Sequence, residues 1–309
     1  MKKTILATAL TTLFAASANA ATIYEANDVT IDVFGDSEIV LLNPISKSEP
    51  FIVDIQDADF GFALGYKLSE DVVLGSTVAF GVDDASGAAQ LDESYVALAS
   101  EMYGTLSIGK QYTIYDESGI GNDYQFGFTA FYDQTDAGEQ VIKYSIDKDV
   151  FYGAVAFLLD SGVSDTGASG FDGKIGVRFA DFDLAVYHAQ VEEAAGNEIS
   201  NTNVELGYAL TESLLLQASY GQTDNDSYTE TTDTVGLAAI YQYTPKIQFA
   251  AGYANIDAAA GSANDGIENQ YYVNTSYLVN DYINTYVELG GNDGDDSQLG
   301  AAAGVQVAF

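Results

Sequence analysis

The chain has 309 residues, of which 46 are acidic and 10 basic, and its formal net charge is −36 at pH 7. This excess of negative charge argues against nucleic acid as a partner, because nucleic-acid-binding domains are basic. Disorder is excluded by 22 tyrosines, 16 phenylalanines and a hydrophobic content of 47%. Without cysteine, no disulfide framework can stabilise the protein.

The first twenty residues, MKKTILATALTTLFAASANA, have the three parts of a secretory signal peptide. Lys2 and Lys3 form a positive start, Ile5–Ala16 a mostly apolar core, and Ala18–Ala20 an A-x-A cleavage site. We therefore expect residues 1–20 to be removed, leaving one exported domain at residues 21–309. No later run of 18 apolar residues follows, so the sequence predicts no transmembrane helix.

The mature chain begins with two stretches of strict alternation. Over Val29–Leu42, Asp32, Asp36 and Glu38 lie on one face and apolar residues on the other. Over Asp59–Leu68, large apolar residues alternate with small ones and a terminal lysine. A period of two predicts β-strands whose two faces meet different surroundings.

Alternation continues to the end of the chain, and short turns take turns with longer loops. Short turns are expected near 102–104, 147–149, 180–182, 211–213, 244–245 and 279–281, and longer loops near 83–90, 160–172, 192–201, 223–232, 257–268 and 291–297. The last strand lies within Ser297–Phe309, with Leu299, Val305 and Phe309 on its apolar face.

These segments amount to sixteen strands. Membrane strands need about 9–11 residues each, which the spacing accommodates. An open sheet edge cannot persist in hydrocarbon, so the first and last strands must pair. A soluble β-sandwich, the alternative, explains neither the even count nor a strand at the terminus. We predict an all-β fold, a transmembrane antiparallel up-and-down β-barrel of 16 strands.

The stretch SYVALASEMYGTLSIGKQYT (Ser94–Thr113), the final Phe309 and the strand count resemble the general diffusion porins of Gram-negative outer membranes. The resemblance implies a homotrimer of water-filled channels among outer-membrane lipids and lipopolysaccharide, without a cofactor. It also implies that the assembly machinery reads Phe309 in the C-terminal strand. Asp116–Gln140 matches by position the third loop, which folds into the lumen. This loop lacks the Pro-Glu-Phe-Gly-Gly of enteric porins and has GNDYQFGFTAFYD instead.

The resemblance also predicts ion preference. Enteric porins set basic residues across the lumen from the acidic third loop, and by motif two of those places fall on Asp36 and Glu93, with a third on Ala63. A narrow acidic pore concentrates cations and repels anions. We therefore predict a cation-preferring channel for ions and small hydrophilic solutes. Its predicted pore-lining residues are Asp32, Asp36, Glu38, Glu93, Asp116, Glu117 and Asp123.

The basic residues are expected outside the constriction. Lys67, Lys143 and Arg178 have lumen parity but lie a few residues from predicted periplasmic turns, and Lys174 lies at the outer rim.

Lys110 shares its parity with Leu106 and Ile108 and therefore points outward. We interpret it as a subunit-interface residue, neutralised by Asp83 or Asp84 of a neighbouring copy. The alternative is a lysine near a rim that extends its ammonium to the headgroups.

A substrate-specific channel, for example for oligosaccharides, remains open as an alternative. Such channels present aromatic rings along the lumen. Tyr95 and Phe34 have lumen parity, and a cluster in the third loop adds Tyr124, Phe126, Phe128, Phe131 and Tyr132.

An outer-membrane enzyme is a weaker alternative. The only histidine is His188, which alternates with Tyr187 and Ala189 and is expected to face the lumen, and there is no Gly-x-Ser-x-Gly motif. Two acidic stretches, Asn292–Gln298 and Asp165–Gly173, lack the ligand spacing of an EF-hand. We predict no catalytic residue and no metal site.

Overall fold

The computed structural model describes residues 20–82, 88–128, 136–159, 168–193, 196–262 and 264–309. Within these ranges the chain forms seventeen β-strands and one 3-10 turn, η1 (Tyr115–Glu117). No helix in the described part of the chain is long and apolar enough to cross a membrane.

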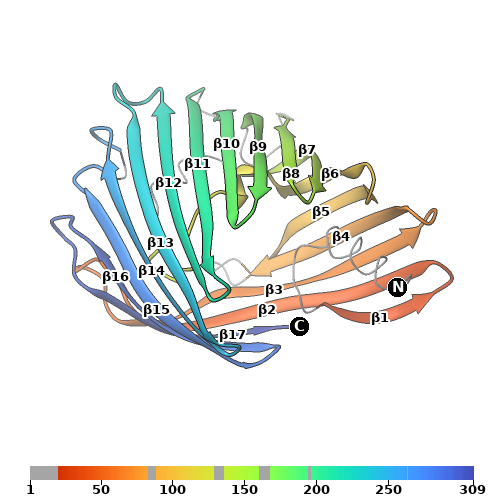
Figure 1. The fold of residues 1–309 in the computed structure, drawn as a ribbon, viewed down its shortest axis with the longest axis horizontal. Coiled ribbons are helices and arrows are strands. Elements are labelled where there is room, and N and C mark those ends of the chain that lie inside the picture. The colour runs from red at the N-terminus through yellow and green to blue at the C-terminus, as the bar shows by residue number, and fades with distance from the viewer. Residues whose placement is uncertain (1–19, 83–87, 129–135, 160–167, 194–195, 263) are drawn as a thin grey trace.

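The strands follow one another around a single antiparallel sheet (Figure 1). They are β1 (Ala21–Ala26), β2 (Val29–Asn43), β3 (Ile52–Lys67), β4 (Val72–Val82), β5 (Ala89–Ser100), β6 (Gly104–Tyr112), β7 (Ala137–Lys148), β8 (Phe151–Leu158), β9 (Ser169–Phe179), β10 (Phe182–Glu192), β11 (Glu198–Thr211), β12 (Leu214–Asn225), β13 (Thr232–Thr244), β14 (Ile247–Asp257), β15 (Asn269–Asn280), β16 (Ile283–Asn292) and β17 (Gly300–Ala308). From β2 to β17 each strand pairs with the next, and β17 pairs with β2. The predicted sixteen-stranded barrel is confirmed.

Barrel closure uses the last strand, as the sequence predicts. β17 pairs with the second half of β2, from Ala301↔Asn43 to Ala308↔Asp36. Phe309 and Gly35 then exchange two backbone hydrogen bonds of 2.9 Å. β1, which the sequence analysis did not predict, continues this edge by pairing with the first part of β2. Its two-residue turn, with positive φ at both residues, suits a tight hairpin.

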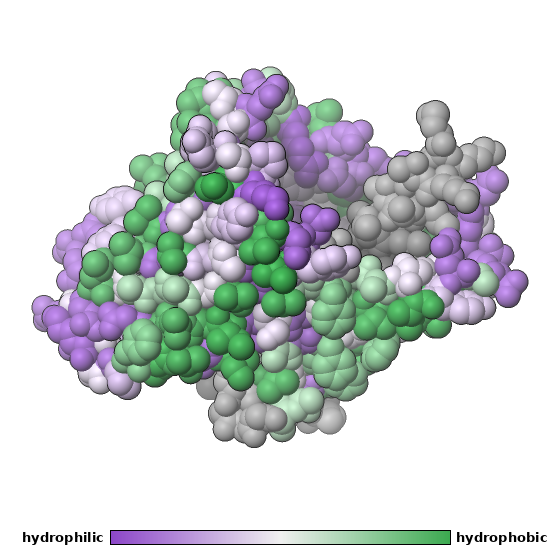
Figure 2. All heavy atoms as spheres, turned by 90° about the horizontal axis from the view of Figure 1, so that it is seen from below, coloured by the Kyte–Doolittle hydropathy of each residue, from purple (hydrophilic) through white to green (hydrophobic). Residues whose placement is uncertain are grey.

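The two faces of each strand differ as the alternation predicts. In β17, Val305 and Val307 are exposed outside, whereas Ala302 and Gly304 are buried inside. Figure 2 shows one side of the barrel, with hydrophobic side chains gathered across its middle and hydrophilic ones toward both ends. Exposed apolar residues of this kind occur around the wall, among them Phe60, Phe62, Leu98, Leu106, Ile108, Val235, Leu237, Val287 and Leu289. An outward apolar band between polar ends fits a wall that faces lipid.

Strand boundaries differ from the predicted ones where bulges occur. β3 begins at Ile52 rather than at Asp59, and its register with β2 shifts between Glu38 and Ile39. At the bulge the alternation of inward and outward residues breaks, although the strand continues on the other side. The sequence pattern therefore did not reveal the first part of β3. The loops expected at 192–201 and 223–232 shorten to 193–197 and 226–231, because the flanking strands are longer.

Buried apolar residues lie between the wall and the connection of β6 to β7, residues 113–136, which we call the third loop. One cluster contains Ile114 and Tyr115 of the loop with Val141 and Tyr187 of the wall. A second contains Ile120, Phe126 and Phe128 with wall residues such as Tyr272 and Tyr286. The described part of the third loop, residues 113–128, is therefore packed inside the barrel.

Candidate functional site

The third loop runs along the inner wall from β9 to β16, held by hydrogen bonds to its backbone. Its amide groups donate in turn to Asp172 on β9, Glu205 on β11, Gln217 on β12, Tyr272 on β15 and Glu288 on β16. Because strands far apart in the barrel contribute acceptors, the loop narrows the lumen over about half of its circumference.

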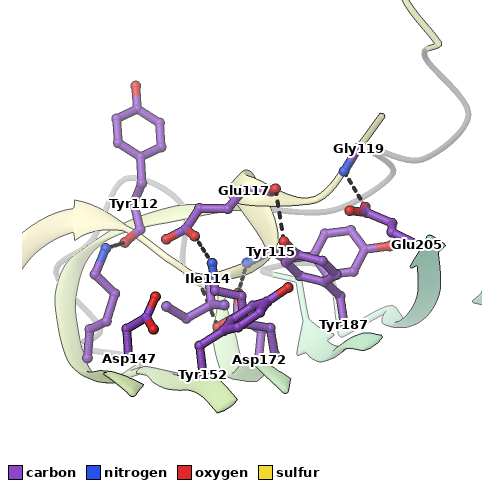
Figure 3. A network of polar contacts seen from close by, with 12 residues as sticks. Tyr112, Ile114, Tyr115, Glu117, Gly119, Asp147, Tyr152, Asp172, Tyr187 and Glu205 are labelled. Carbon is purple, nitrogen blue, oxygen red and sulfur yellow. Dashed lines mark hydrogen bonds and ion pairs between the residues drawn. The ribbon is translucent and has the colours of Figure 1, made fainter. Parts of the chain in front are cut away.

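The start of the loop is attached by carboxylates (Figure 3). Asp172 accepts hydrogen bonds from the amides of Ile114 (3.1 Å) and Tyr115 (2.8 Å). Glu205 accepts one from Gly119 at 2.5 Å. Charge-assisted bonds of this kind are stronger than those between neutral groups, so they fix the loop firmly.

Glu288 holds the second half of the loop. It accepts the amides of Tyr124 (2.9 Å), Gln125 (2.7 Å) and Phe126 (2.8 Å), and the Nδ2 group of Asn274 (2.8 Å). Its side chain is only 1% exposed. A buried carboxylate without these donors would be strongly unfavourable, so Glu288 and the loop stabilise each other.

Aromatic residues of the described loop attach it to the wall. Phe126 and Phe128 are 6% and 5% exposed and pack over glycines of the wall, where a Cβ at Gly290 would lie 2.4 Å from Phe126. Tyr124 stacks on Tyr286 with ring centroids 3.8 Å apart. The rings of Phe126 and Phe128 therefore offer little surface to a passing sugar. Phe131 and Tyr132 lie outside the described residues.

The two aromatic residues of the wall that were predicted to face the lumen are also buried or partly buried. Phe34 is buried on the inner face, with its ring where a Cβ of Gly61 would lie. Tyr95 is partly buried and packs against the same cluster. Neither residue forms an open aromatic track.

The exposed residues in the described part of the loop are all acidic. Between residues 113 and 128, only Asp116, Glu117 and Asp123 are exposed. Partial desolvation inside the barrel raises the pKa of Asp116 to about 6, helped by the negative charges of Asp136 and Glu117, while Lys143 opposes the shift. Partial desolvation also raises the pKa of Asp123. Acidic groups that the sequence assigned to the pore are thus the ones that the loop presents to water.

Further carboxylates gather on the inner face of β2, β3 and β5. Asp36 and Glu38 lie opposite Asp59 and Asp57 in the register of β2 with β3, and Glu93 lies on β5. Among the described residues, none of these five forms an ion pair with a lysine or arginine. Asp57 and Asp59 were not predicted as site residues. Asp59 shares the parity of the inward Gly61, which was the available signal.

Two predicted pore residues are engaged within the wall. Asp32 is buried and accepts a hydrogen bond of 2.6 Å from Thr22. Glu38 accepts hydrogen bonds from Tyr286 (2.5 Å) and Gln306 (2.6 Å). Both lie on the inner face, with their oxygens engaged by neighbouring side chains.

Two lysines lie closer to the third loop than the sequence analysis expected. Lys143 donates to the carbonyl oxygen of Tyr112 at 3.0 Å, at the root of the loop, so the expectation that it misses the constriction is wrong. Lys174 forms an ion pair with Glu117 of the loop rather than standing apart at the rim. Position along the strand predicted the Cα depth, whereas the long side chains determine where the charge lies.

Arg178 lies beside the β7–β8 turn, as expected, where its guanidinium binds Asp147 at 2.9 Å. The same group contacts Asp183 at 3.3 Å and lies over the ring of Tyr152.

Lys110 has a partner within its own chain. Its Nζ lies 2.5 Å from Glu139 of the neighbouring strand β7. Asp83 and Asp84, the carboxylates that the sequence analysis assigned to it from another copy, lie outside the described residues.

His188 faces outward, so its expected lumen orientation is wrong. Tyr187 points inward and donates to the carbonyl oxygen of Glu117, whereas His188 is exposed and contacts Thr202 and Phe171. The inner face of β10 packs on the third loop and is therefore apolar. For this strand, the polar residue of the alternation faces outward rather than toward the lumen.

The acidic side chains do not gather into a cation site in the described chain. In the described part of the chain, no group of three or more His, Cys, Asp or Glu side chains is placed to hold a metal ion. Asp293, in the acidic stretch 292–298, accepts the amides of Glu268 and Asn269 at 2.9 Å. Most of the stretch 165–173 lies outside the described residues.

A closed barrel with an inward loop and an acidic lumen can be compared with known proteins. The family described as "Gram-negative porin" matches residues 7–297 of the chain. The chain belongs to this family. It is 30% identical to the porin-like protein H of Photobacterium profundum, over the whole length of both chains. Membership and fold together place this porin in the outer membrane.

Solved structures show the same fold at low identity. A loop L8 deletion mutant of OmpT, an outer membrane protein of Vibrio cholerae, superposes with a TM-score of 0.77 at 17% identity, covering 92% of this chain and all of that one. An anion-selective porin from Comamonas acidovorans superposes with a TM-score of 0.71 at 16% identity, over 91% of this chain and all of that one. Because the latter is described as anion-selective, the fold alone does not determine which ions a porin prefers.

Proposed function

We propose that this porin forms a water-filled channel that passes ions and small hydrophilic solutes by diffusion and prefers cations. The observation that carries the proposal is the presence of two acidic groups inside the barrel, one on the third loop and one on the wall. Asp116, Glu117 and Asp123 are the exposed residues of the described third loop. Asp36, Asp59 and Glu93 lie on the inner wall and form no ion pair with a lysine or arginine in the described chain.

The physical reason is electrostatic. A narrow passage between low-dielectric walls focuses the field of its fixed charges, so cations accumulate and anions are depleted. This role covers the predicted lining residues Asp32, Asp36, Glu38, Glu93, Asp116, Glu117 and Asp123. Asp57 and Asp59 join them on the basis of their register.

The proposal includes export, membrane setting and assembly. Residues 1–20 direct export and are removed, and residues 21–309 form the barrel. The mature barrel sits in the outer membrane as a homotrimer among lipids and lipopolysaccharide. Support for the trimer comes from a relative in fold, OmpT of Vibrio cholerae, which is described in a trimer form. Phe309, paired with Gly35 at the seam, is the residue that the assembly machinery would recognise.

A diffusion channel is favoured over a sugar-specific one and over an enzyme. Phe126 and Phe128 are buried against the wall rather than displayed to the lumen. The relative that shows the family is a porin-like protein. Liposome swelling tests the choice, because uptake should fall smoothly with solute size. Saturable uptake of one sugar would contradict it.

Ion preference is tested by the zero-current potential of the purified protein in a planar bilayer under a KCl gradient. We expect the sign that corresponds to faster passage of K⁺ than of Cl⁻. A potential of the opposite sign would overturn the proposed preference and leave only the channel.

A further inference from the structure

Lys143 is a basic residue at the root of the third loop. It lies on the inner face of β7, opposite Ser107 on β6 and Ala156 on β8, both of which are buried. Its Nζ donates to the carbonyl oxygen of Tyr112 at 3.0 Å. Among the described residues, no carboxylate lies within ion-pair distance of it.

Three carboxylates nevertheless act on this ammonium group at longer range. Lys143 interacts electrostatically with Glu93 on β5, Asp116 on the loop and Asp172 on β9. Glu93 also accepts a hydrogen bond from the backbone of Tyr112, whose carbonyl oxygen receives Lys143. One peptide segment thus lies between the lysine and an acid of the proposed cation path.

Lys174, the other lysine near the loop, is arranged differently. It pairs directly with Glu117, and its Nζ lies 5.9 Å and 5.7 Å from the ring centroids of Tyr152 and Tyr187. Its charge is therefore compensated locally. Lys143 keeps a positive field that extends to its acidic neighbours and to the water between them.

We propose that Lys143 is a fixed cation of the constriction that limits how strongly the pore prefers cations. This inference rests on the proposed function. The ammonium occupies a place near Glu93 and Asp116 that a passing cation would otherwise take. It lowers the cation concentration there and raises that of anions, so this pore is less selective than its carboxylates alone would make it.

The expected size follows from Coulomb's law. Two unit charges about 7 Å apart in water interact by about the thermal energy. Removing the charge should therefore change the local concentration of each ion by about a factor of three. Because the local cation concentration rises while the anion concentration falls, the cation-to-anion permeability ratio should increase by about threefold or more.

The test compares zero-current potentials of the full-length protein and its variants in planar bilayers under a KCl gradient. Lys143→Gln removes the charge and keeps a group that can donate a hydrogen bond, whereas Lys143→Arg keeps the charge. Lys67→Gln is the matched control, since it makes the same charge change on the inner wall beside the β1–β2 hairpin. We expect a higher permeability ratio for Lys143→Gln only.

Salt concentration distinguishes the charge from a structural effect. Between about 0.1 M and 1 M KCl the Debye length falls from about 10 Å to about 3 Å, so an effect of charge should fade. A change in Lys143→Gln that persists at high salt would reflect a displaced loop and overturn the inference.

The remaining outcomes separate the inference from the proposal on which it rests. A cation-selective wild type with an unchanged Lys143→Gln variant contradicts the role of Lys143 and leaves the proposed function intact. An anion-selective wild type contradicts both.

Discussion

Carboxylates on the inner wall fall into two groups with different surroundings. On β9, β11 and β16, Asp172, Glu205 and Glu288 accept backbone amides of the third loop and are largely covered by it. On β2 and β3, Asp36 interacts with Asp57 and Asp59 and has no basic partner in the described chain. The same residue type thus has two uses, since buried acids with donors hold the loop and acids beside other acids charge the water path.

The largest expected effect comes from the acid that holds the loop most completely. Glu288→Ala leaves three successive loop amides without their acceptor, and each buried unsatisfied donor costs about 1–3 kcal/mol. We expect the second half of the loop to leave the wall, and single-channel conductance to change strongly and become noisier.

Glu139→Ala serves as the control for this variant, because it removes an acid whose side chain is 42% exposed. It should leave the conductance close to that of the wild type. Equal conductance in Glu288→Ala and the wild type would show that packing of Phe126 and Phe128 holds the loop without the carboxylate.

The pH dependence of ion selectivity tests the acids that charge the water path. Because the pKa of Asp116 is raised to about 6, its carboxylate gains a proton as the pH falls through that value. The loop then loses negative charge next to Lys143, so cation preference should decrease on acidification. The zero-current potential, recorded from neutral pH to below 6, measures the change.

Asp116→Asn removes the titrating group while keeping its shape. This variant should start with weaker cation preference at neutral pH and lose most of the step near pH 6. An undiminished step in Asp116→Asn would assign the titration to other acids, such as Asp123.

The smallest effect concerns the outer surface, where an acid and a base pair directly. A lysine that faces acyl chains costs roughly 2–4 kcal/mol, and Glu139 offers neutralisation within the chain. Lys110→Ala and Glu139→Ala should lower the temperature of trimer dissociation in detergent by similar small amounts. The double variant should fall no further, with a coupling of about 0.2–1 kcal/mol.

If Lys110→Ala destabilises the trimer and Glu139→Ala does not, the partner of Lys110 lies in another copy. That result would favour the neighbour's Asp83 or Asp84.

Sequence patterns were sufficient for the barrel because lipid imposes a period of two on every strand. They predicted the closing strand near Phe309 and the inward faces of Asp36 and Glu93. They failed for His188, because the inner face of β10 packs on Tyr115 of the loop and is as apolar as the outer face. Alternation of polar and apolar residues identifies the lipid-facing side of a strand only where the opposite side is exposed to water.

Two further differences have equally specific causes. Asp57 was missed because a bulge opposite Glu38 interrupts the alternation and the strand continues beyond it. The orientations of Phe126 and Phe128 could not be predicted, since a loop without periodicity does not indicate which side meets the wall. The depth of the Lys143 charge was misjudged because it depends on a flexible side chain rather than on strand position.

The most direct test of the central claim reverses two charges of the water path. Asp36→Lys combined with Glu93→Lys is compared with the wild type by zero-current potential under a KCl gradient at low ionic strength, where screening is weakest. We predict a cation-selective wild type and a double variant whose potential is much reduced or of opposite sign. A double variant with the potential of the wild type would contradict the claim that these unpaired carboxylates set the ion preference.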